Sequence, residues 1–129
     1  MKPLWLYVSG PYTQGDPVVN VRNAVRVAEI IREAGHVPIV PHLSMLWHMI
    51  SPHEWDYWLD LDLALLERCD GMVRISGDSK GADREQKVAQ NLGMVVITIK
   101  GDQSGLDYLR HSLTITNWTR AANRGEYGP

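Results

Sequence analysis

Cysteine is almost absent from this sequence, because Cys69 is the only one, and no internal disulfide can form. A long apolar run is also missing, since no segment approaches the ~20 residues that a helix needs to cross a bilayer. The chain leads from Lys2 directly into a strand-like segment, which is unlike a signal peptide. We therefore expect a cytoplasmic protein that makes no membrane contact and works where thiols stay reduced.

An excess of positive charge is missing as well. The chain carries 13 Lys and Arg against 15 Asp and Glu, so we expect no broad basic surface for nucleic acid. It contains neither a GxGxxG segment nor a Walker motif, which disfavours a dinucleotide oxidoreductase or an NTPase. The histidines at 42, 48 and 53 do not have zinc-site spacing, and we expect neither a metal nor a cofactor.

Strand-like and helix-like segments alternate along the chain. Short apolar runs cover residues 4–8, 36–40, 70–75 and 94–99, and helical patterns cover residues 17–34, 52–68, 81–92 and 104–111. Residues 42–52 are expected to form a loop. This alternation predicts an α/β fold: a doubly wound, Rossmann-like or flavodoxin-like sheet of four to five mainly parallel strands with helices on both faces. We expect one domain over residues 1–120 and a flexible tail over residues 121–129.

The predicted sheet also indicates where a ligand binds. In such sheets the ligand lies at the carboxyl ends of the strands, next to the switch in strand order. Ser9, His42 and Gly77 each lie at or just after the end of a predicted strand. We therefore expect these three loops to share one rim.

One acidic residue lies on the apolar face of a predicted helix. At about 100° per residue, the apolar side chains of helix 81–92 share one face: Ala82, Val88, Ala89 and Leu92. Glu85 falls in the middle of that face, where a glutamate is costly unless it has a partner or lines a cavity. Glu85 is also near the helix N-terminus, where the helix dipole favours the ionised carboxylate.

The preceding predicted helix repeats this arrangement. Its apolar face consists of Trp55, Trp58, Leu59, Leu65 and Leu66. Asp62 lies inside that face, and both helices adjoin the strand at residues 70–75, so the two acids can converge over its carboxyl end. Either acid alone is equally well explained as a core residue with a backbone or arginine partner, whereas the two together favour a functional site.

Ser79, Lys80 and Gly81 precede the helix that carries Glu85. Free N–H groups at a helix N-terminus bind anions, and glycine permits close approach. An ordinary N-cap with a solvated lysine is the favoured explanation of these three residues when they are taken alone.

Four segments in order have the pattern of a known family. They are Leu6-Tyr7-Val8-Ser9-Gly10-Pro11, Gly35-His36 before a strand ending at Pro41, Asp62-Leu63 with Cys69-Asp70-Gly71, and Ser79-x-Gly81-x-x-x-Glu85. In this order and spacing, over roughly residues 4–100, the chain resembles the nucleoside 2-deoxyribosyltransferase superfamily, which includes the 2′-deoxynucleoside 5′-monophosphate N-hydrolases.

The resemblance implies cleavage or exchange of the N-glycosidic bond of a small-molecule nucleoside or its 5′-monophosphate. Glu85 would be the nucleophile at C1′, Asp62 the acid that assists departure of the base, and Tyr7 a holder of the nucleophile or the sugar. The substrate and its phosphate would be bound by further residues: Ser9, Gly10, Tyr12, Ser79, Lys80 and Gly81. The base would lie toward a pocket containing His42, Trp47 and His48, and aromatic or imidazole rings suit a flat polar ligand.

The chain departs from the family pattern in two places. The loop from Pro11 to Asp16 has no arginine, unlike that of the monophosphate hydrolases, and Asp83-Arg84 replaces small or aromatic residues before the glutamate. In the family a residue late in the chain often completes the site of a neighbouring subunit. Asn117 and Ser112 are the candidates, and we expect a homodimer or homotetramer.

An alternative function from a different class is a non-catalytic nucleotide sensor on the same fold. Such a sensor would keep the anion site at Ser79 and Gly81, and it would not need both acids. The presence of Glu85 together with Asp62 therefore favours the enzyme.

Overall fold

The computed structural model describes residues 2–119, so the predicted tail over residues 121–129 lies outside the described part of the chain. The strands are β1 (Trp5–Ser9), β2 (Val37–Ile39), β3 (Gly71–Ile75) and β4 (Val95–Ile99). The helices are α1 (Pro17–Glu33), α2 (Met45–Ile50), α3 (Trp55–Glu67), α4 (Lys80–Asn91) and α5 (Gln103–Ile115). Of the helices described, none is long and apolar enough to cross a membrane.

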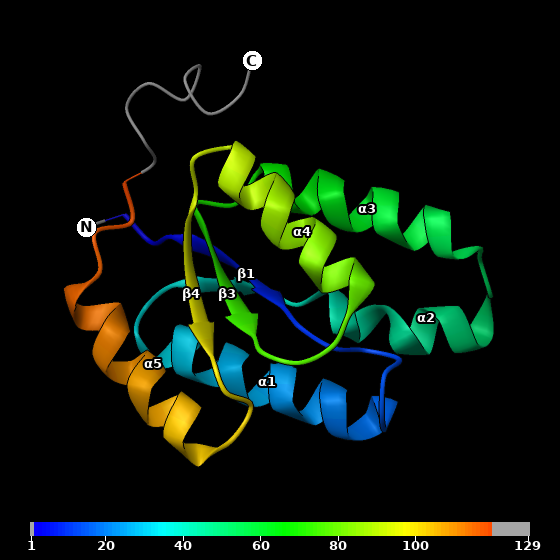
Figure 1. Cartoon of the computed structure of the whole chain (residues 1–129), viewed down its shortest axis with the longest axis horizontal. Helices are drawn as coiled ribbons and strands as arrows, with labels where there is room; N and C mark the ends of the chain where they lie inside the picture. Colours follow the sequence, from blue (N-terminus) through cyan, green and yellow to red (C-terminus); the bar gives the residue numbers. More distant parts are fainter. Residues whose placement is uncertain (1, 120–129) are drawn as a thin grey trace.

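The four strands form one parallel sheet in the order β2-β1-β3-β4 (Figure 1). At the centre, Tyr7 of β1 is paired with Ile39 of β2 on one side and with Met72 of β3 on the other. The chain runs outward from β1 to β2 and from β3 to β4, so the switch in strand order lies between β1 and β3. The predicted doubly wound α/β fold is confirmed, and such sheets bind ligands beside this switch.

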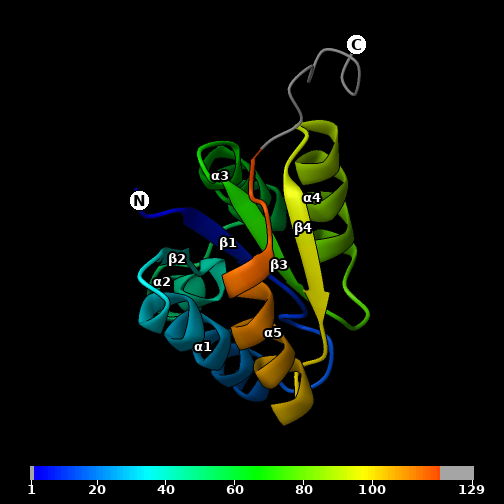
Figure 2. The same cartoon turned by 90° about the vertical axis from the view of Figure 1, so that its left-hand side faces the viewer.

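Helices cover both faces of the sheet. Helices α1 and α5 lie on one face and α3 and α4 on the other, as the edge-on view shows (Figure 2). The first face packs against a large apolar cluster that includes Leu6 and Val8 of β1, and the second packs against a smaller cluster that includes Tyr7. Because strand side chains alternate, Ser9 points to the same face as Tyr7, toward α3 and α4.

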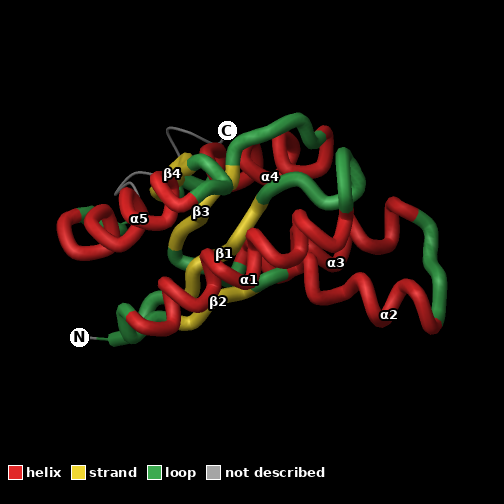
Figure 3. The backbone as a smooth tube through the Cα atoms, turned by 90° about the horizontal axis from the view of Figure 1, so that it is seen from below, coloured by secondary structure: helices red, strands yellow, loops and turns green. Residues whose placement is uncertain are grey.

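The segment predicted to be a loop, residues 42–52, is largely helical instead. A 3-10 turn covers Pro41–Ser44 and α2 follows directly. In the tube view α2 lies beside α3 at the far end of the molecule from α5 (Figure 3). The prediction was wrong because Met45–Ile50 is almost entirely apolar and therefore has no helical periodicity to detect.

The apolar face predicted for α3 is also partly wrong. Leu59 and Leu66 are buried, but Trp55 is 57% exposed and Leu65 is exposed as well. The helix begins at Trp55, after Glu54, rather than at Pro52, so Trp55 belongs to its first turn. Asp62, one turn after Trp58, is half-buried between the apolar and the solvated side.

The start of α5 allows a test of close packing. The side chain of Asp102 caps this helix by accepting a hydrogen bond from the backbone N–H of Gly105. A Cβ atom at Gly105 would overlap the backbone carbonyl group of Lys100, which cannot rotate away like a side chain. Gly105→Ala is therefore expected to lower the free energy of unfolding by about 2–4 kcal/mol, measured by urea denaturation.

The matched control for that variant is Gly81→Ala. Gly81 is also in the first turn of its helix, and a Cβ atom there meets no atom within 4 Å. Equal urea midpoints for the two variants would contradict the close packing at Gly105.

Candidate active site

A cleft of about 1070 Å³ opens at the carboxyl ends of β1 and β3. Its lining comes from the loop after β1, the α2 segment, one side of α3 and the first turns of α4; it includes Gly10, Tyr12, His42, His48, Trp58, Asp62, Ser79, Lys80, Gly81 and Glu85. Its volume is slightly above the usual range for small-molecule sites, about 300–1,000 Å³. The cleft brings together both predicted acids and the predicted anion site.

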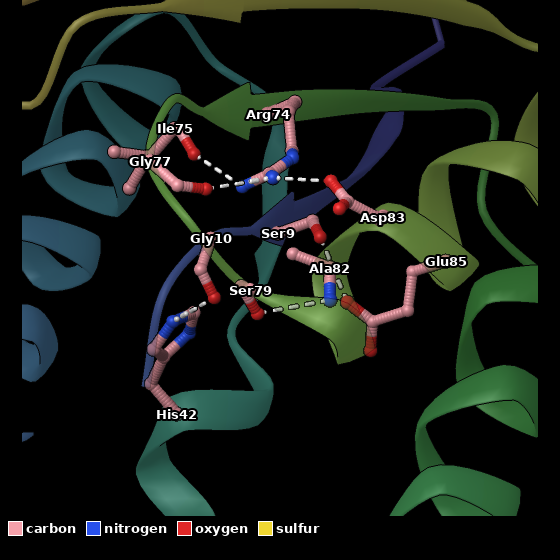
Figure 4. Close-up of polar contacts among 10 residues, drawn as sticks. All are labelled: Ser9, Gly10, His42, Arg74, Ile75, Gly77, Ser79, Ala82, Asp83 and Glu85. Atoms are coloured by element: carbon pink, nitrogen blue, oxygen red, sulfur yellow. Dashed lines mark hydrogen bonds and ion pairs between the residues drawn. The ribbon is translucent and has the colours of Figure 1, made fainter. Parts of the chain in front are cut away.

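Glu85 is buried at the floor of this cleft, with only 6% of its surface exposed. Its Oε2 accepts a hydrogen bond from the Tyr7 hydroxyl, and its Oε1 accepts one from the Ser9 hydroxyl, each at 2.7 Å. Figure 4 shows the Ser9 side chain reaching Glu85 from β1. The alternation of β1 places both donors on the α4 side, so the carboxylate is held from beneath while it faces the cleft.

The surroundings of Glu85 act on its charge in opposite directions. Burial raises the pKa of the Glu85 carboxyl above its usual value, and the hydrogen bonds from Tyr7 and Ser9 and the positive charge of Arg74 offset only part of that rise. The pKa of Tyr7 is raised well above its usual value, mainly by burial and further by the charge of Glu85, so its hydroxyl stays a donor. Both partners therefore stabilise the ionised carboxylate.

Asp62 faces the same cleft from α3 with a different environment. Burial, and then the negative charge of Glu85, raise the pKa of Asp62 to about 7. Asp62 has no hydrogen-bond donor among residues 2–119 to hold its charge, in contrast to Glu85. The hydrogen bonds to Glu85 favour its carboxylate form, whereas Asp62 lacks such donors among the described residues and is suited to act as a proton donor.

Arg74 is a buried charged residue that sequence reasoning missed. Its guanidinium donates to the backbone carbonyls of Ile75 and Gly77 and, at 2.9 Å, to the Asp83 carboxylate (Figure 4). These bonds hold the loop between β3 and α4, and they explain why Asp83 replaces a small or aromatic residue before Glu85. An arginine inside an otherwise apolar strand is the signal that could have identified it.

His42, in the 3-10 turn after β2, holds the loop that follows β1 by hydrogen bonds. Its Nε2 is 3.1 Å from the carbonyl oxygen of Pro11 and 3.3 Å from that of Gly10, and Tyr12 packs edge-on against the ring. Burial lowers the pKa of His42, so the neutral ring donates through Nε2–H. His42 lines the cleft as predicted, and its hydrogen bonds go to the protein backbone.

The start of α4 has the geometry of an N-cap. The Ser79 side chain accepts a hydrogen bond from the Ala82 N–H at 3.1 Å. The N–H groups of Lys80 and Gly81 have no hydrogen-bond partner among the described residues, and the space beside Gly81 is open. Capping by Ser79 leaves these two N–H donors in a turn that lines the cleft, so anion binding stays a prediction that this geometry allows.

Some predicted site residues lie elsewhere. Ser9 was predicted to bind substrate, but it is fully buried beneath Glu85 and donates to it. Trp47 is half exposed and packs edge-on against Trp58, and it is not among the residues that line the cleft. Neither side chain is placed to touch a ligand in the cleft.

The two candidates for a shared site are also outside the cleft. Asn117 is exposed, and its neighbour Trp118 packs on Gly71 at the amino end of β3, opposite the cleft. Ser112 is buried within α5 on the other face of the sheet. Across residues 2–119, no three histidine, cysteine, aspartate or glutamate side chains gather in a way that could hold a metal ion.

A comparison with protein families finds a match over residues 4–98 to the family described as Domain of unknown function (DUF4406). The matched segment covers well over half of the 129 residues. The chain belongs to DUF4406. The DUF4406 match contains every residue that lines the cleft and both donors to Glu85, whereas α5 lies outside it. No curated protein matches this DUF4406 chain.

Proposed function

We propose that this DUF4406 protein cleaves or exchanges the N-glycosidic bond of a nucleoside or a nucleoside 5′-monophosphate. The observation that carries the proposal is the pair of cleft acids. Glu85 is held as a carboxylate by Tyr7 and Ser9, and Asp62, with a pKa of about 7, stands beside it. Reaction at an anomeric carbon through a covalent intermediate needs such a pair, one nucleophile and one acid.

In the first step an oxygen of the Glu85 carboxylate attacks C1′ of the sugar. The C1′–N bond breaks, its electron pair stays on the base nitrogen, and the proton of Asp62 passes to the base. The product is a glycosyl ester on Glu85 and a free base. Tyr7 and Ser9 lie on the side of Glu85 away from the cleft, so they orient the carboxylate without blocking its approach to C1′.

In the second step the Asp62 carboxylate acts as a base. It removes a proton from water, whose oxygen attacks C1′ and breaks the ester, which restores Glu85 and protonated Asp62. If a second nucleobase attacks in place of water, the same step gives base exchange. The roles of acid and base alternate on Asp62, as microscopic reversibility requires.

A 5′-phosphate on the substrate has a matching site at the start of α4. Lys80 and Gly81 line the cleft with N–H groups that have no partner among the described residues, the Lys80 side chain adds a positive charge, and the Ser79 hydroxyl is in the same turn. No arginine stands in the loop after β1, so this turn is the main support for phosphate recognition.

Gly81→Ala tests that phosphate site. The added methyl meets no protein atom, and alanine favours a helix by up to about 1 kcal/mol over glycine, so the fold is expected to be as stable or more stable. The methyl would occupy space next to the two N–H donors. We therefore expect KM for a 5′-monophosphate to rise about ten-fold while KM for the matching nucleoside changes little. An equal change in both KM values would argue against a phosphate at this turn.

We infer further that the protein acts as a homodimer or homotetramer. The support is a group of exposed apolar side chains on and around α2: Leu43, Leu46, Met49, Ile50 and Trp55. Several exposed apolar side chains on one short segment are typical of an interaction site, and two of them, Met49 and Trp55, also line the cleft. A monomer mass by light scattering at working protein concentrations would contradict the inference.

The proposed chemistry is tested by a chromatographic screen for release of free base. Ribonucleosides, 2′-deoxynucleosides and their 5′-monophosphates are each incubated with the protein, with and without a second base as acceptor. Release in water alone indicates a hydrolase, and release that needs the acceptor indicates a transferase. Binding without release from any substrate would instead favour the nucleotide sensor.

A further inference from the structure

His48 is a cleft residue whose hydrogen bonds determine which ring nitrogen carries the proton. Its Nδ1 accepts from the indole Nε1–H of Trp58 at 2.8 Å and from the backbone N–H of His53 at 3.3 Å. A nitrogen that accepts hydrogen bonds carries no proton, so in the neutral ring the proton is on Nε2. This Nε2–H has no hydrogen-bond partner within residues 2–119, and His48 lines the cleft.

Trp58 is rigidly placed to hold His48 in this form. The rings around Trp58 have centroids 5.0–5.6 Å from its own, and they belong to Trp47, His48, His53 and Tyr57. Edge-on packing of this kind restricts rotation of the indole ring. The donor on His48 is therefore oriented before any ligand arrives, which lowers the entropic cost of binding.

The position of this donor relative to the two acids is set by α3. Trp58 and Asp62 are four residues apart, so they lie on one face of the helix, about 6 Å apart along its axis. Asp62 in turn is close enough to Glu85 for their charges to interact. Glu85, Asp62 and His48 all line the cleft. Asp62 is linked to Glu85 by their charge interaction and to Trp58, the partner of His48, by one turn of α3. One helical turn is comparable with the distance from the glycosidic nitrogen of a nucleobase to its far edge.

We propose that His48 determines base specificity by donating Nε2–H to a carbonyl oxygen on the far edge of the base, and that Trp58 is the positioning residue for this donor. This inference rests on the proposed function and names its substrates. Nucleosides of 6-oxopurines and 4-oxopyrimidines are preferred over the corresponding amino compounds. An amino group at that position directs N–H against N–H, and neither donor then has an acceptor.

The test uses substrates that differ chiefly at this position. They are 2′-deoxyinosine against 2′-deoxyadenosine, and 2′-deoxyuridine against 2′-deoxycytidine. For the wild type we expect kcat/KM to be about 10- to 100-fold higher for the oxo member of each pair. His48→Phe removes the donor and should bring the ratio to within about three-fold of one. Trp58→Phe keeps an aromatic ring but removes the indole N–H, and it should lower the ratio as well.

Trp55→Phe is the matched control. Trp55 is on the same helix and also lines the cleft, but its indole N–H makes no hydrogen bond to any described residue. The same chemical change there should leave the oxo-to-amino ratio unchanged, whatever it does to the absolute rates. If Trp55→Phe lowers the oxo-to-amino ratio as much as Trp58→Phe does, the ratio depends on any disturbance of the cleft lining from α3, and the proposal is overturned.

Binding to Glu85→Gln separates this inference from the proposed chemistry. Calorimetry with the four nucleosides is run on Glu85→Gln with and without His48→Phe. Selective binding of the oxo members that depends on His48 supports the inference even when the wild type releases no base. Turnover without an oxo preference supports the N-glycosidase and overturns the role of His48. Failure of all four nucleosides and of their 5′-monophosphates to bind overturns both.

Discussion

Glu85→Gln is expected to reduce base release by at least about 1000-fold, the largest effect among the variants considered. A neutral amide is a very poor nucleophile toward C1′, so the glycosyl ester cannot form. The substitution should leave the fold intact, because the Tyr7 and Ser9 hydroxyls can both donate and accept and can therefore pair with either end of an amide. It also removes the cost of burying a charge.

The measurement is single-turnover base release on the substrate that the screen identifies, with circular dichroism and urea unfolding to confirm the fold. Asp60→Asn is the matched control, because it neutralises an exposed acid on α3 that is not among the cleft-lining residues. We expect its activity to stay within about two-fold of the wild type. A Glu85→Gln protein that retained a tenth of the activity or more would exclude the nucleophile role.

Asp62→Asn is expected to make the protein less active and, at neutral and alkaline pH, more stable. As a proton donor Asp62 contributes about 10²- to 10⁴-fold to the rate, which asparagine cannot supply. The wild-type kcat/KM should fall as pH rises above about 7, because Asp62 loses the proton that the leaving base needs. Asp62→Asn has no such proton, so this alkaline decline should disappear from its pH profile.

The stability change follows from the same raised pKa. In the unfolded chain Asp62 ionises near its ordinary value of 3.8, but in the folded protein it holds its proton until about pH 7. Between these values the unfolded chain releases a proton that the folded protein keeps, so the folded protein loses relative stability as pH rises. Above pH 7 the folded protein carries the full free-energy cost of an ionised, buried Asp62 carboxylate. Asp62→Asn should remove this cost and raise the free energy of unfolding by the order of 2–4 kcal/mol.

Urea unfolding at several pH values checks this second prediction. At pH 4 or below, Asp62→Asn and the wild type should have similar stability, and the difference should grow to its maximum above pH 7. The Asp60→Asn control should show no such growth. An Asp62→Asn protein that is less stable than the wild type at pH 8 would mean that Asp62 is held by a partner as a carboxylate.

Much of this arrangement could be predicted from the sequence, because periodic patterns report which side of an element is buried. The alternation of strands and helices predicted the parallel sheet, and the helical period placed Glu85 among Ala82 and Ala89, where the structure has it. The period could not identify its partners, since Tyr7 is 78 residues away in sequence. Ser9 shows the same limit, because its side chain type suits a substrate contact as well as a buried donor.

Other parts of the site carry no periodic signal. The α2 segment is almost uniformly apolar, so its helix and the hydrogen bond from Trp58 to His48 depend on tertiary packing. Asn117 could be named from its place late in the chain, but its position at the amino end of the sheet depends on how Trp118 packs against Gly71. Such contacts between distant segments are set by the fold as a whole.

The alternation of β1 has a consequence for how preparations of this protein are to be judged. Leu6 and Val8 belong to the core on one face, and Tyr7 and Ser9 hold Glu85 on the other. A shift of β1 by one residue would exchange the two sets. A molecule with that error would lose both the core packing of Leu6 and Val8 and the hydrogen bonds from Tyr7 and Ser9 to Glu85. Molecules with the shifted strand would be inactive rather than weakly active. The specific activity of a preparation would therefore be proportional to the fraction of molecules with the correct strand pairing.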